Sequence, residues 1–216
     1  MGIEYEFNFL VLYLHIYGKM RAFIAIDLPD EVKRALAQIQ TQIKLSDLRG
    51  VKWVNPYGIH LTLQFLGNVS PSKLDEVSSA IANASHGIPP FHLAIKGLGV
   101  FPNLKRVQVV WVGIDGEIDK LINLQKLIEI HLTPLGFTPE KRAFTPHLTV
   151  ARLRNEVTLD ERQRLGQVIA NTRFEKAYDF EVDAVNLMKN QLTKEGAIYS
   201  RISSVRLEKS LPKDNA

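Results

Sequence analysis

The sequence predicts an α+β fold in which a duplicated unit forms two lobes, with two antiparallel sheets around a central cleft and helices on the outside. Three observations support this fold class. Short segments with alternating apolar residues indicate strands, and longer segments with apolar residues three or four positions apart indicate helices. These candidate elements recur in the same order in both halves of the chain. Some connections between candidate strands are short, as between Leu98 and Val107, which favours antiparallel pairing.

The first half of the chain reads as strand, helix, strand, helix and strand. In the first helix, Leu36, Ile39 and Ile43 lie three and four positions apart, the spacing of one helix face. The second helix follows Ser70-Pro71, with serine at the cap and proline at the first helical position. We therefore predict strands over residues 21–27, 59–66 and 91–100, and helices over residues 31–45 and 71–84.

The second half of the chain repeats this order. A strand over residues 107–112 is followed by a turn at Asp115-Gly116 and a helix over residues 117–130. Thr158 and Glu161 have the spacing of a capping box, which predicts where the next helix begins. The remaining predicted elements are strands over residues 146–153, 180–188 and 197–207 and a helix over residues 158–170.

The spacing of the elements also agrees between the two halves. His60 lies 37 residues after Phe23, at the centre of the first strand, and His147 lies 38 residues after Val109. A single unit would bury little apolar surface, so we expect the two units to pack as lobes around a pseudo-twofold axis. We assign residues 20–208 to one bilobal domain and residues 209–216 to a C-terminal tail.

Residues 1–19 differ in character from the rest of the chain. The apolar run over residues 9–17 is shorter than the about 20 residues that a membrane span needs. Glu4 and Glu6 precede it, whereas a signal peptide has a basic start. We interpret residues 1–19 as a disordered extension or the product of an upstream start codon. An extra edge strand and a membrane-touching anchor are the alternatives.

The composition excludes several classes of site. The chain has 216 residues and no cysteine, which excludes a disulfide scaffold, a thiol nucleophile and cysteine-ligated zinc. The absence of cysteine fits a reducing compartment, and we expect a cytoplasmic monomer without a membrane partner. A net charge of +4 is compatible with a partner that carries phosphate.

Three of the six histidines are followed two positions later by threonine. His60-Leu61-Thr62 and His147-Leu148-Thr149 lie in predicted strands at equivalent points of the duplication. Residues i and i+2 of a strand share a face, so each histidine is predicted to lie beside its threonine. The third pair, His131 and Thr133, ends a predicted helix, where the two side chains diverge. We therefore do not expect the third pair to be catalytic.

Two histidine–threonine pairs in one cleft would suit metal-free displacement at phosphorus. Imidazoles with a pKa of about 6.5 can share one proton at neutral pH, so that one acts as base and the other as acid. Threonine hydroxyls can donate to phosphoryl oxygens. No acidic residue occurs from residue 48 to 74 or between Glu140 and Glu156. This distribution disfavours a serine–histidine–aspartate triad or a metal site and favours an anionic ligand, so we expect no metal and no cofactor.

The two motif regions resemble a known family. Residues 60–67 (HLTLQFLG) and 146–152 (PHLTVAR) are similar to the two signatures of the two-histidine phosphoesterases. More narrowly, they resemble LigT-type RNA 2′,3′-cyclic phosphodiesterases, also called 2′-5′ RNA ligases. The first predicted strand, Trp53-Val54 and residues 187–199 are also similar, so the resemblance covers about residues 20–208.

The resemblance implies a reaction and a set of roles. The substrate would be a 2′,3′-cyclic phosphate at an RNA end, opened by water to a 2′-phosphomonoester. In the family's usual assignment His60 protonates the leaving 3′ oxygen and His147 activates water, although the symmetry of the lobes leaves this division open. Thr62 and Thr149 would hold the phosphate oxygens, and Arg152 would add a cationic contact.

The resemblance leaves other points open. Phe65 either stacks on a base or packs, Tyr199 is similarly ambiguous, and Trp53 is expected in the core rather than as a base platform. Reversible 2′-5′ ligation of tRNA halves is an alternative activity within the same chemistry. Small cyclic nucleotides are alternative substrates, and a non-catalytic RNA-binding module is the alternative from another class.

Overall fold

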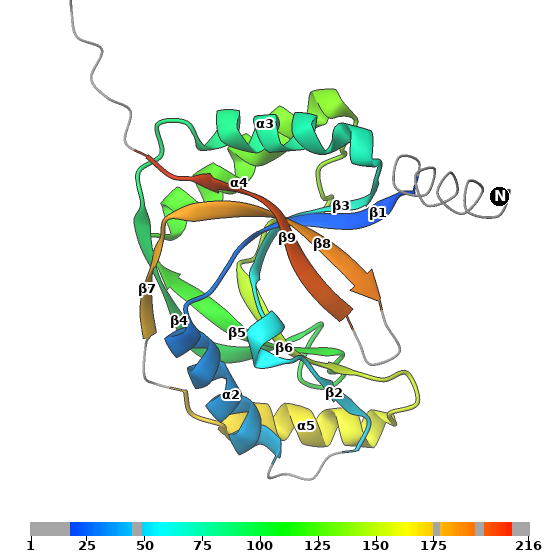
Figure 1. The fold of residues 1–216 in the computed structure, drawn as a ribbon. Coiled ribbons are helices and arrows are strands. Elements are labelled where there is room, and N and C mark those ends of the chain that lie inside the picture. Colours follow the sequence, from blue (N-terminus) through cyan, green and yellow to red (C-terminus); the bar gives the residue numbers. More distant parts are fainter. Residues whose placement is uncertain (1–17, 45–48, 175–177, 193–196, 209–216) are drawn as a thin grey trace, which may run out of the picture.

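Two antiparallel sheets form the centre of the molecule, and helices cover their outer faces (Figure 1). The computed structural model describes residues 18–44, 49–174, 178–192 and 197–208. The strands of the first sheet, in spatial order, are β3 (Leu61–Val69), β1 (Met20–Ile26), β8 (Ala184–Leu192) and β9 (Ala197–Arg206). Those of the second sheet are β2 (Val51–Trp53), β6 (His147–Leu153), β5 (Val109–Gly116), β4 (Phe91–Phe101) and β7 (Tyr178–Val182). The predicted α+β class with two antiparallel sheets is confirmed.

Two helices cover each sheet (Figure 1). Helices α3 (Leu74–Ser85) and α4 (Ile118–Leu132) lie together over the first sheet, where the hydroxyls of Ser78 and Ser203 are 2.8 Å apart. Helices α2 (Asp30–Lys44) and α5 (Leu159–Asn171) lie over the second sheet (Figure 1). The opposite face of each sheet carries no helix, and we call it the helix-free face.

Three short 3₁₀ helices complete the structure: η1 (Pro56–Gly58), η2 (Pro71–Lys73) and η3 (Thr133–Leu135). Ser70 and Pro71 begin η2, and α3 follows directly, so the predicted start signal opens a 3₁₀ turn. The predicted capping box is present, because Thr158 and Glu161 exchange side-chain and backbone hydrogen bonds at the start of α5. Strand β2 was not among the predicted elements.

The duplicated units exchange strands. The first unit places β1 and β3 in the first sheet and its last strand, β4, in the second sheet. The second unit places β5 and β6 in the second sheet and returns β8 to the first sheet. Each sheet therefore combines strands from both halves of the sequence, so that the two lobes are not the two halves.

The predicted single strand over residues 180–188 is wrong. Strand β7 pairs with β4 in the second sheet, and β8 pairs with β1 in the first sheet, with Asp183 between them. The backbone carbonyl of Asp183 accepts a hydrogen bond from the Leu207 amide at 2.7 Å. The break shows in the apolar pattern, because Val182 and Val185 are three positions apart whereas strand alternation requires two.

The predicted turn at Asp115-Gly116 is also wrong. Both residues belong to β5, where Asp115 pairs with Ala94 and Gly116 pairs with Leu93. Gly116 has φ = 99°, and a Cβ atom there would lie 2.8 Å from the carbonyl oxygen of His92. The Asp-Gly pair therefore marks a close approach of two strands rather than a turn.

One continuous apolar core connects both sheets with their helices. Strand β1 is at its centre, because its residues from Ala22 to Ile26 are buried on both faces. Within the ranges that the structure describes, no helix is both long and apolar enough to cross a membrane. The predictions for residues 1–17 and 209–216 fall outside those ranges.

Candidate active site

The first motif lies at the start of β3. His60 directly precedes the strand, Leu61 and Leu63 are buried, and Thr62 is half-buried. Thr62 pairs with Ala25 of β1, on the helix-free face of the first sheet. This alternation follows from the sequence, because leucines on both sides of a threonine on a half-buried strand turn the hydroxyl away from the core.

The second motif repeats this arrangement on β6. His147 begins the strand, and Leu148 and Val150 are fully buried. His147 and Thr149 are half-buried and pair with Gly113 and Trp111 of β5. The predicted pairing of each histidine with its threonine on one face is thus present in both strands.

A β-bulge follows the threonine in each motif. On β3, Ile24 pairs with Gln64 and Ala25 with Thr62, so that Leu63 is the extra residue. On β6, Val110 pairs with Ala151 and Trp111 with Thr149, so Val150 is the extra residue. A bulge reverses the alternation of the residues that follow it.

The bulges therefore bring two more side chains to the helix-free faces. Phe65 pairs with Phe23, and Arg152 pairs with Val109, each on the same face as the preceding threonine. Both residues are exposed, and Phe65 retains 60% of its accessible surface. Without the bulges, an offset of five residues from the histidine would place Phe65 and Arg152 on the opposite face.

The backbone orients both imidazole rings in the same way. The Nδ1 atom of His60 lies 2.9 Å from the carbonyl oxygen of Gly58, and Nδ1 of His147 lies 2.7 Å from that of Thr145. A carbonyl oxygen only accepts, so Nδ1 carries the proton in each ring. The Nε2 atom of each ring is left to accept or donate a proton.

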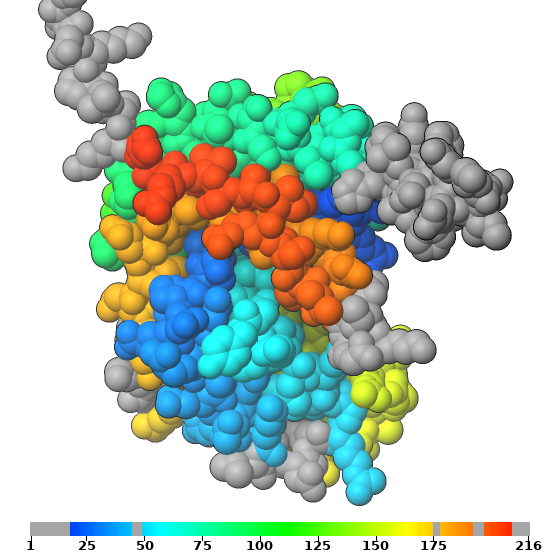
Figure 2. All heavy atoms as spheres, in the orientation of Figure 1, coloured from blue at the N-terminus to red at the C-terminus, as the bar shows by residue number. Residues whose placement is uncertain are grey.

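Aromatic side chains of the first sheet surround the ring of His60. Phe23 stacks on it with ring centres 4.5 Å apart, and Tyr199 contacts it edge-on at 4.9 Å. The backbone of Gly58 in η1 lies against the Tyr199 ring. In Figure 2 the red strand β9 lies beside the cyan segment that contains η1. Tyr199 therefore supports the catalytic candidate His60 directly.

The ring of His147 is held by aromatic side chains of the second sheet. Phe101 contacts it edge-on at 5.0 Å, and the Trp111 ring centre lies 6.4 Å away. The Trp111 ring covers the backbone of Gly99, where a Cβ atom would lie 2.1 Å from the indole. Gly99 is therefore required for this position of Trp111.

Burial lowers the pKa of His60 below its usual value of 6.5. The hydrogen bond to Gly58 and the negative charge of Asp27 oppose this effect, and the positive charge of Lys33 adds to it. Asp27 and Lys33 form an ion pair at 3.0 Å. Asp27 is a carboxylate that the fold brings near His60, although none is close in the sequence.

The side chains predicted to bind phosphate have no polar partner among the residues that the structure describes. Within the described part of the chain, the hydroxyls of Thr62 and Thr149 have no hydrogen-bond partner, and Arg152 forms no ion pair. No group of three or more histidine, aspartate or glutamate side chains suited to a metal ion occurs among the same residues. The arrangement offers two imidazoles, two hydroxyls and a guanidinium, which together suit an oxyanion ligand.

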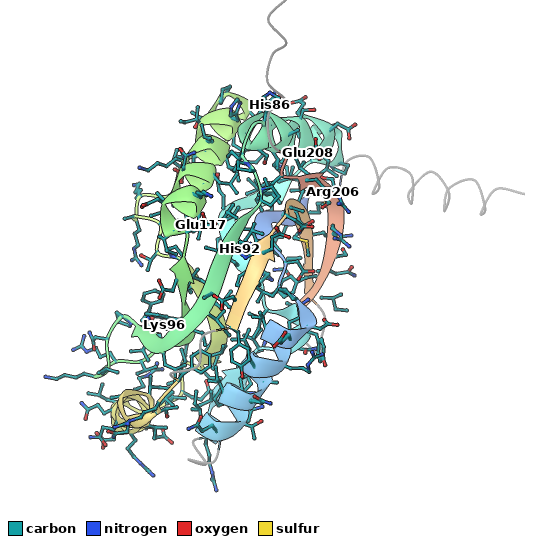
Figure 3. All side chains as sticks on the ribbon, turned by 90° about the vertical axis from the view of Figure 1, so that its left-hand side faces the viewer. His86, His92, Lys96, Glu117, Arg206 and Glu208 are labelled. Atoms are coloured by element: carbon teal, nitrogen blue, oxygen red, sulfur yellow. The ribbon has the colours of Figure 1, made fainter. Side chains whose placement is uncertain are left out.

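The other histidines of the described ranges lie away from the two motifs. His131 is in the last turn of α4, and the Thr133 hydroxyl donates to the Glu129 carbonyl at 2.8 Å, as expected for a helix end. His86 ends α3, and His92 lies on β4 beside Glu117 (Figure 3). Trp53 packs against the core, as predicted, with the Lys44 ammonium 5.1 Å from its ring centre.

Sequence reasoning missed several residues around the rings. Trp111 and Phe101 belong to no motif that the sequence shows. Asp27 lies near the first motif only because β1 pairs with β3. One signal was available in the sequence. Two glycines lie next to Trp111, Gly99 opposite it on β4 and Gly113 two residues later on β5. Glycines in strands often mark a place where a large ring lies across the sheet.

The fold brings the strands that carry the two motifs into contact. Strands β3 and β6 contact each other although they belong to different sheets. With α3 and α4 above and α2 and α5 below, the helix-free faces are directed toward the middle of the molecule (Figure 1). Two facing sheets of a duplicated unit, each with a histidine–threonine strand, define a two-histidine phosphoesterase.

Comparison with known proteins identifies the family. The model of the LigT-like phosphoesterase family matches the chain twice, over residues 26–111 and 112–199, which correspond to the two repeats. The chain therefore belongs to the LigT-like phosphoesterase family.

Relatives and solved structures agree with this membership. The RNA 2′,3′-cyclic phosphodiesterase of Methanothermobacter thermautotrophicus is 33% identical over 189 residues, which are 88% of this chain and all of the relative. The enzyme of the same name from Aquifex aeolicus is 30% identical over 87% of this chain and 97% of its own. The crystal structure of TT0787 of Thermus thermophilus superposes with a TM-score of 0.71, 25% identity and coverage of 89% and 100% of the two chains. LigT of Escherichia coli, solved with 3′-AMP, has the same fold, with a TM-score of 0.70, 24% identity and coverage of 88% and 99%.

Proposed function

We propose that the protein hydrolyses 2′,3′-cyclic phosphate ends of RNA to 2′-phosphomonoesters, without a metal, by acid–base catalysis with His60 and His147. The observation that carries the proposal is the equivalence of the two motifs. Each imidazole donates Nδ1–H to the backbone, and each has a threonine on the same face whose hydroxyl, like the Nε2 atom of the ring, has no hydrogen-bond partner among the described residues. The names of the relatives at 30–34% identity support this substrate.

The proposed reaction is an in-line displacement. A water oxygen attacks phosphorus opposite the P–O3′ bond, a new P–O bond forms, and the P–O3′ bond breaks. The basic imidazole takes a proton from the water, and the acidic imidazole gives a proton to O3′. The product carries a 2′-phosphate and a free 3′ hydroxyl. Thr62, Thr149 and Arg152 would donate hydrogen bonds to the non-bridging oxygens, where the negative charge is concentrated.

The division of roles follows the family, with His60 as acid and His147 as base. Burial favours the neutral form of His60 in the free protein, whereas an acid must be protonated. A phosphate anion bound beside the ring favours the protonated form and raises the pKa. Substrate binding thus prepares His60 for the acid role. Because one chain carries both motifs, a monomer would be sufficient, and we expect it to act in the cytoplasm.

The test uses an oligoribonucleotide that ends in a 2′,3′-cyclic phosphate, with purified protein in EDTA. We expect complete conversion to the 2′-phosphate, identified by its chromatographic mobility against 2′- and 3′-phosphate standards. His60→Ala and His147→Ala should each lower the rate about 100- to 10,000-fold, the range of general acid–base catalysis. Full activity in both variants would overturn the proposal.

The third histidine–threonine pair supplies matched controls. His131→Ala makes the same change at the end of α4 and should leave the rate near that of the wild type. Loss of activity in EDTA would instead reveal a metal requirement. Joining of two RNA fragments under the same conditions would show 2′-5′ ligation, in which the 5′ hydroxyl of a second strand attacks phosphorus in place of water and the P–O3′ bond breaks in the same way.

A further inference from the structure

Lys52 is the direct cross-strand neighbour of Arg152. The register of β2 with β6 pairs Lys52 with Arg152, between the pairs Val51–Leu153 and Trp53–Ala151. Trp53 and Val51 are half-buried against the core, so Lys52 is on the opposite, helix-free face with Arg152. Opposed side chains of an antiparallel pair have Cβ atoms about 4.5–5.5 Å apart.

Two like charges at this distance destabilise a sheet unless another charge lies between them. Among the described residues neither Lys52 nor Arg152 forms an ion pair or a side-chain hydrogen bond, and both are exposed. The carboxylate of Glu156, which is close in the sequence, forms its ion pair with Arg154 at 3.8 Å and not with Arg152 or Lys52. The pair is therefore a cationic position without an internal counter-charge, next to the strand that carries the second motif.

The equivalent position in the first sheet is different. Phe65 takes the place of Arg152, with Phe23 beside it at 6.1 Å between ring centres. Five residues after each histidine, the first helix-free face therefore presents an aromatic side chain and the second presents a cationic one. A nucleotide has one aromatic and one anionic part, and only one orientation satisfies both faces.

We infer that Lys52, beside the Arg152 that holds the reacting phosphate, binds the phosphodiester next to the reacting end, so that the enzyme favours an RNA strand over a free cyclic mononucleotide. This inference rests on the proposed function. The terminal base would lie toward Phe65, and the chain of the RNA would continue over β6 and β2. Lys52 is a binding residue for the polymer and takes no part in the bond changes.

The experiment measures kcat/KM on two substrates, a short oligoribonucleotide with a 2′,3′-cyclic end and a 2′,3′-cyclic mononucleotide. Wild type, Lys52→Gln and the control Lys126→Gln are compared, because Lys126 is an exposed lysine on α4. For Lys52→Gln we expect a roughly 3- to 10-fold loss on the oligonucleotide, a much smaller loss on the mononucleotide, and a salt dependence that is shallower by about 0.7 in log–log slope. Lys52→Glu should lose more than Lys52→Gln.

The outcomes separate this inference from the proposed function. Equal losses on both substrates, or an unchanged preference and salt dependence in both Lys52 variants, would overturn the inference while the hydrolysis stands. A wild-type protein that opens neither substrate would overturn the proposed function. Equal effects of the Lys52 and Lys126 substitutions would show general electrostatic attraction and would also contradict a specific pair.

Discussion

At the scale of single residues, the two motif threonines have nothing to bind within the described parts of the chain. Their hydroxyls lie on the helix-free faces without a partner, although a half-buried hydroxyl usually finds one. Their position two residues after each histidine places them beside the imidazoles. Both hydroxyls are therefore available to donate a hydrogen bond to a ligand.

Replacing either threonine by valine should test this role. Valine keeps the shape and β-branching but removes the donor, so Thr62→Val and Thr149→Val should each lower kcat/KM about 10- to 100-fold, the value of a hydrogen bond to a charged group. The folded state should be unaffected, as followed by thermal unfolding. Thr133→Val, at the end of α4, is the matched control. Wild-type kinetics in both site variants would rule out phosphate binding by these hydroxyls.

The pKa of His60 gives a second prediction at this scale. Burial places its pKa below 6.5, so the folded protein binds fewer protons than the unfolded chain near that pH. The contribution of His60 to stability is thus present above pH 6.5 and decreases as the pH falls toward the lowered pKa. An NMR titration of the ring should show a midpoint below 6.5 that rises when inorganic phosphate is added. A midpoint at or above 6.5 in the free protein would contradict this account.

At the scale of elements, helix α2 is linked to the second sheet by a buried side chain. The Nε2 atom of Gln40 donates to the Val54 carbonyl at 2.7 Å and to the Val150 carbonyl at 2.9 Å. Val150 is the bulged residue of β6, and Val54 follows β2. Gln40 therefore holds the bulge that brings Arg152 to the helix-free face.

Substitution of Gln40 should affect both stability and activity. Gln40→Leu leaves the Val54 carbonyl without this donor and should cost about 1–3 kcal/mol of unfolding free energy. Because the bulge loses support, kcat/KM should fall by more than the unfolded fraction explains. Urea unfolding and kinetics on the same preparation measure the two effects. An unchanged unfolding free energy would show that the two hydrogen bonds contribute no net stability.

Most elements followed from local patterns, and the exceptions have physical causes. Helix α2 was predicted by the spacing of Leu36, Ile39 and Ile43. The start of α5 was predicted by the capping box of Thr158 and Glu161. The division of residues 180–188 depends on which sheet each part joins, which is a long-range property. The histidines and threonines of the site could be predicted because they form a repeated motif. The contacts of Phe101 and Trp111 with His147 and the pairing of Lys52 with Arg152 could not, because they depend on how the strands pair.

At the scale of the whole molecule, the strand exchange and the continuous core predict cooperative unfolding. Neither sheet can be complete without both halves, so residues 20–208 should unfold in one transition. Trp53 and Trp111, the only two tryptophans, are both in the second sheet, and circular dichroism reports on all elements. Urea transitions followed by fluorescence and by circular dichroism should therefore coincide. Separate midpoints would show that the sheets unfold independently.

The exchange of β4 and β8 has a consequence for how such a protein can arise. A polypeptide of half this length would leave its sheet without the inner strand that the other half supplies, β8 in the first sheet or β4 in the second, but two identical copies could lend this strand to each other. That pair would have a true twofold axis and a histidine–threonine strand from each copy. The present chain holds the two units in one covalent polypeptide. Within one chain the two units can carry different side chains at equivalent positions, Phe65 in one and Arg152 in the other, whereas a pair of identical copies could not.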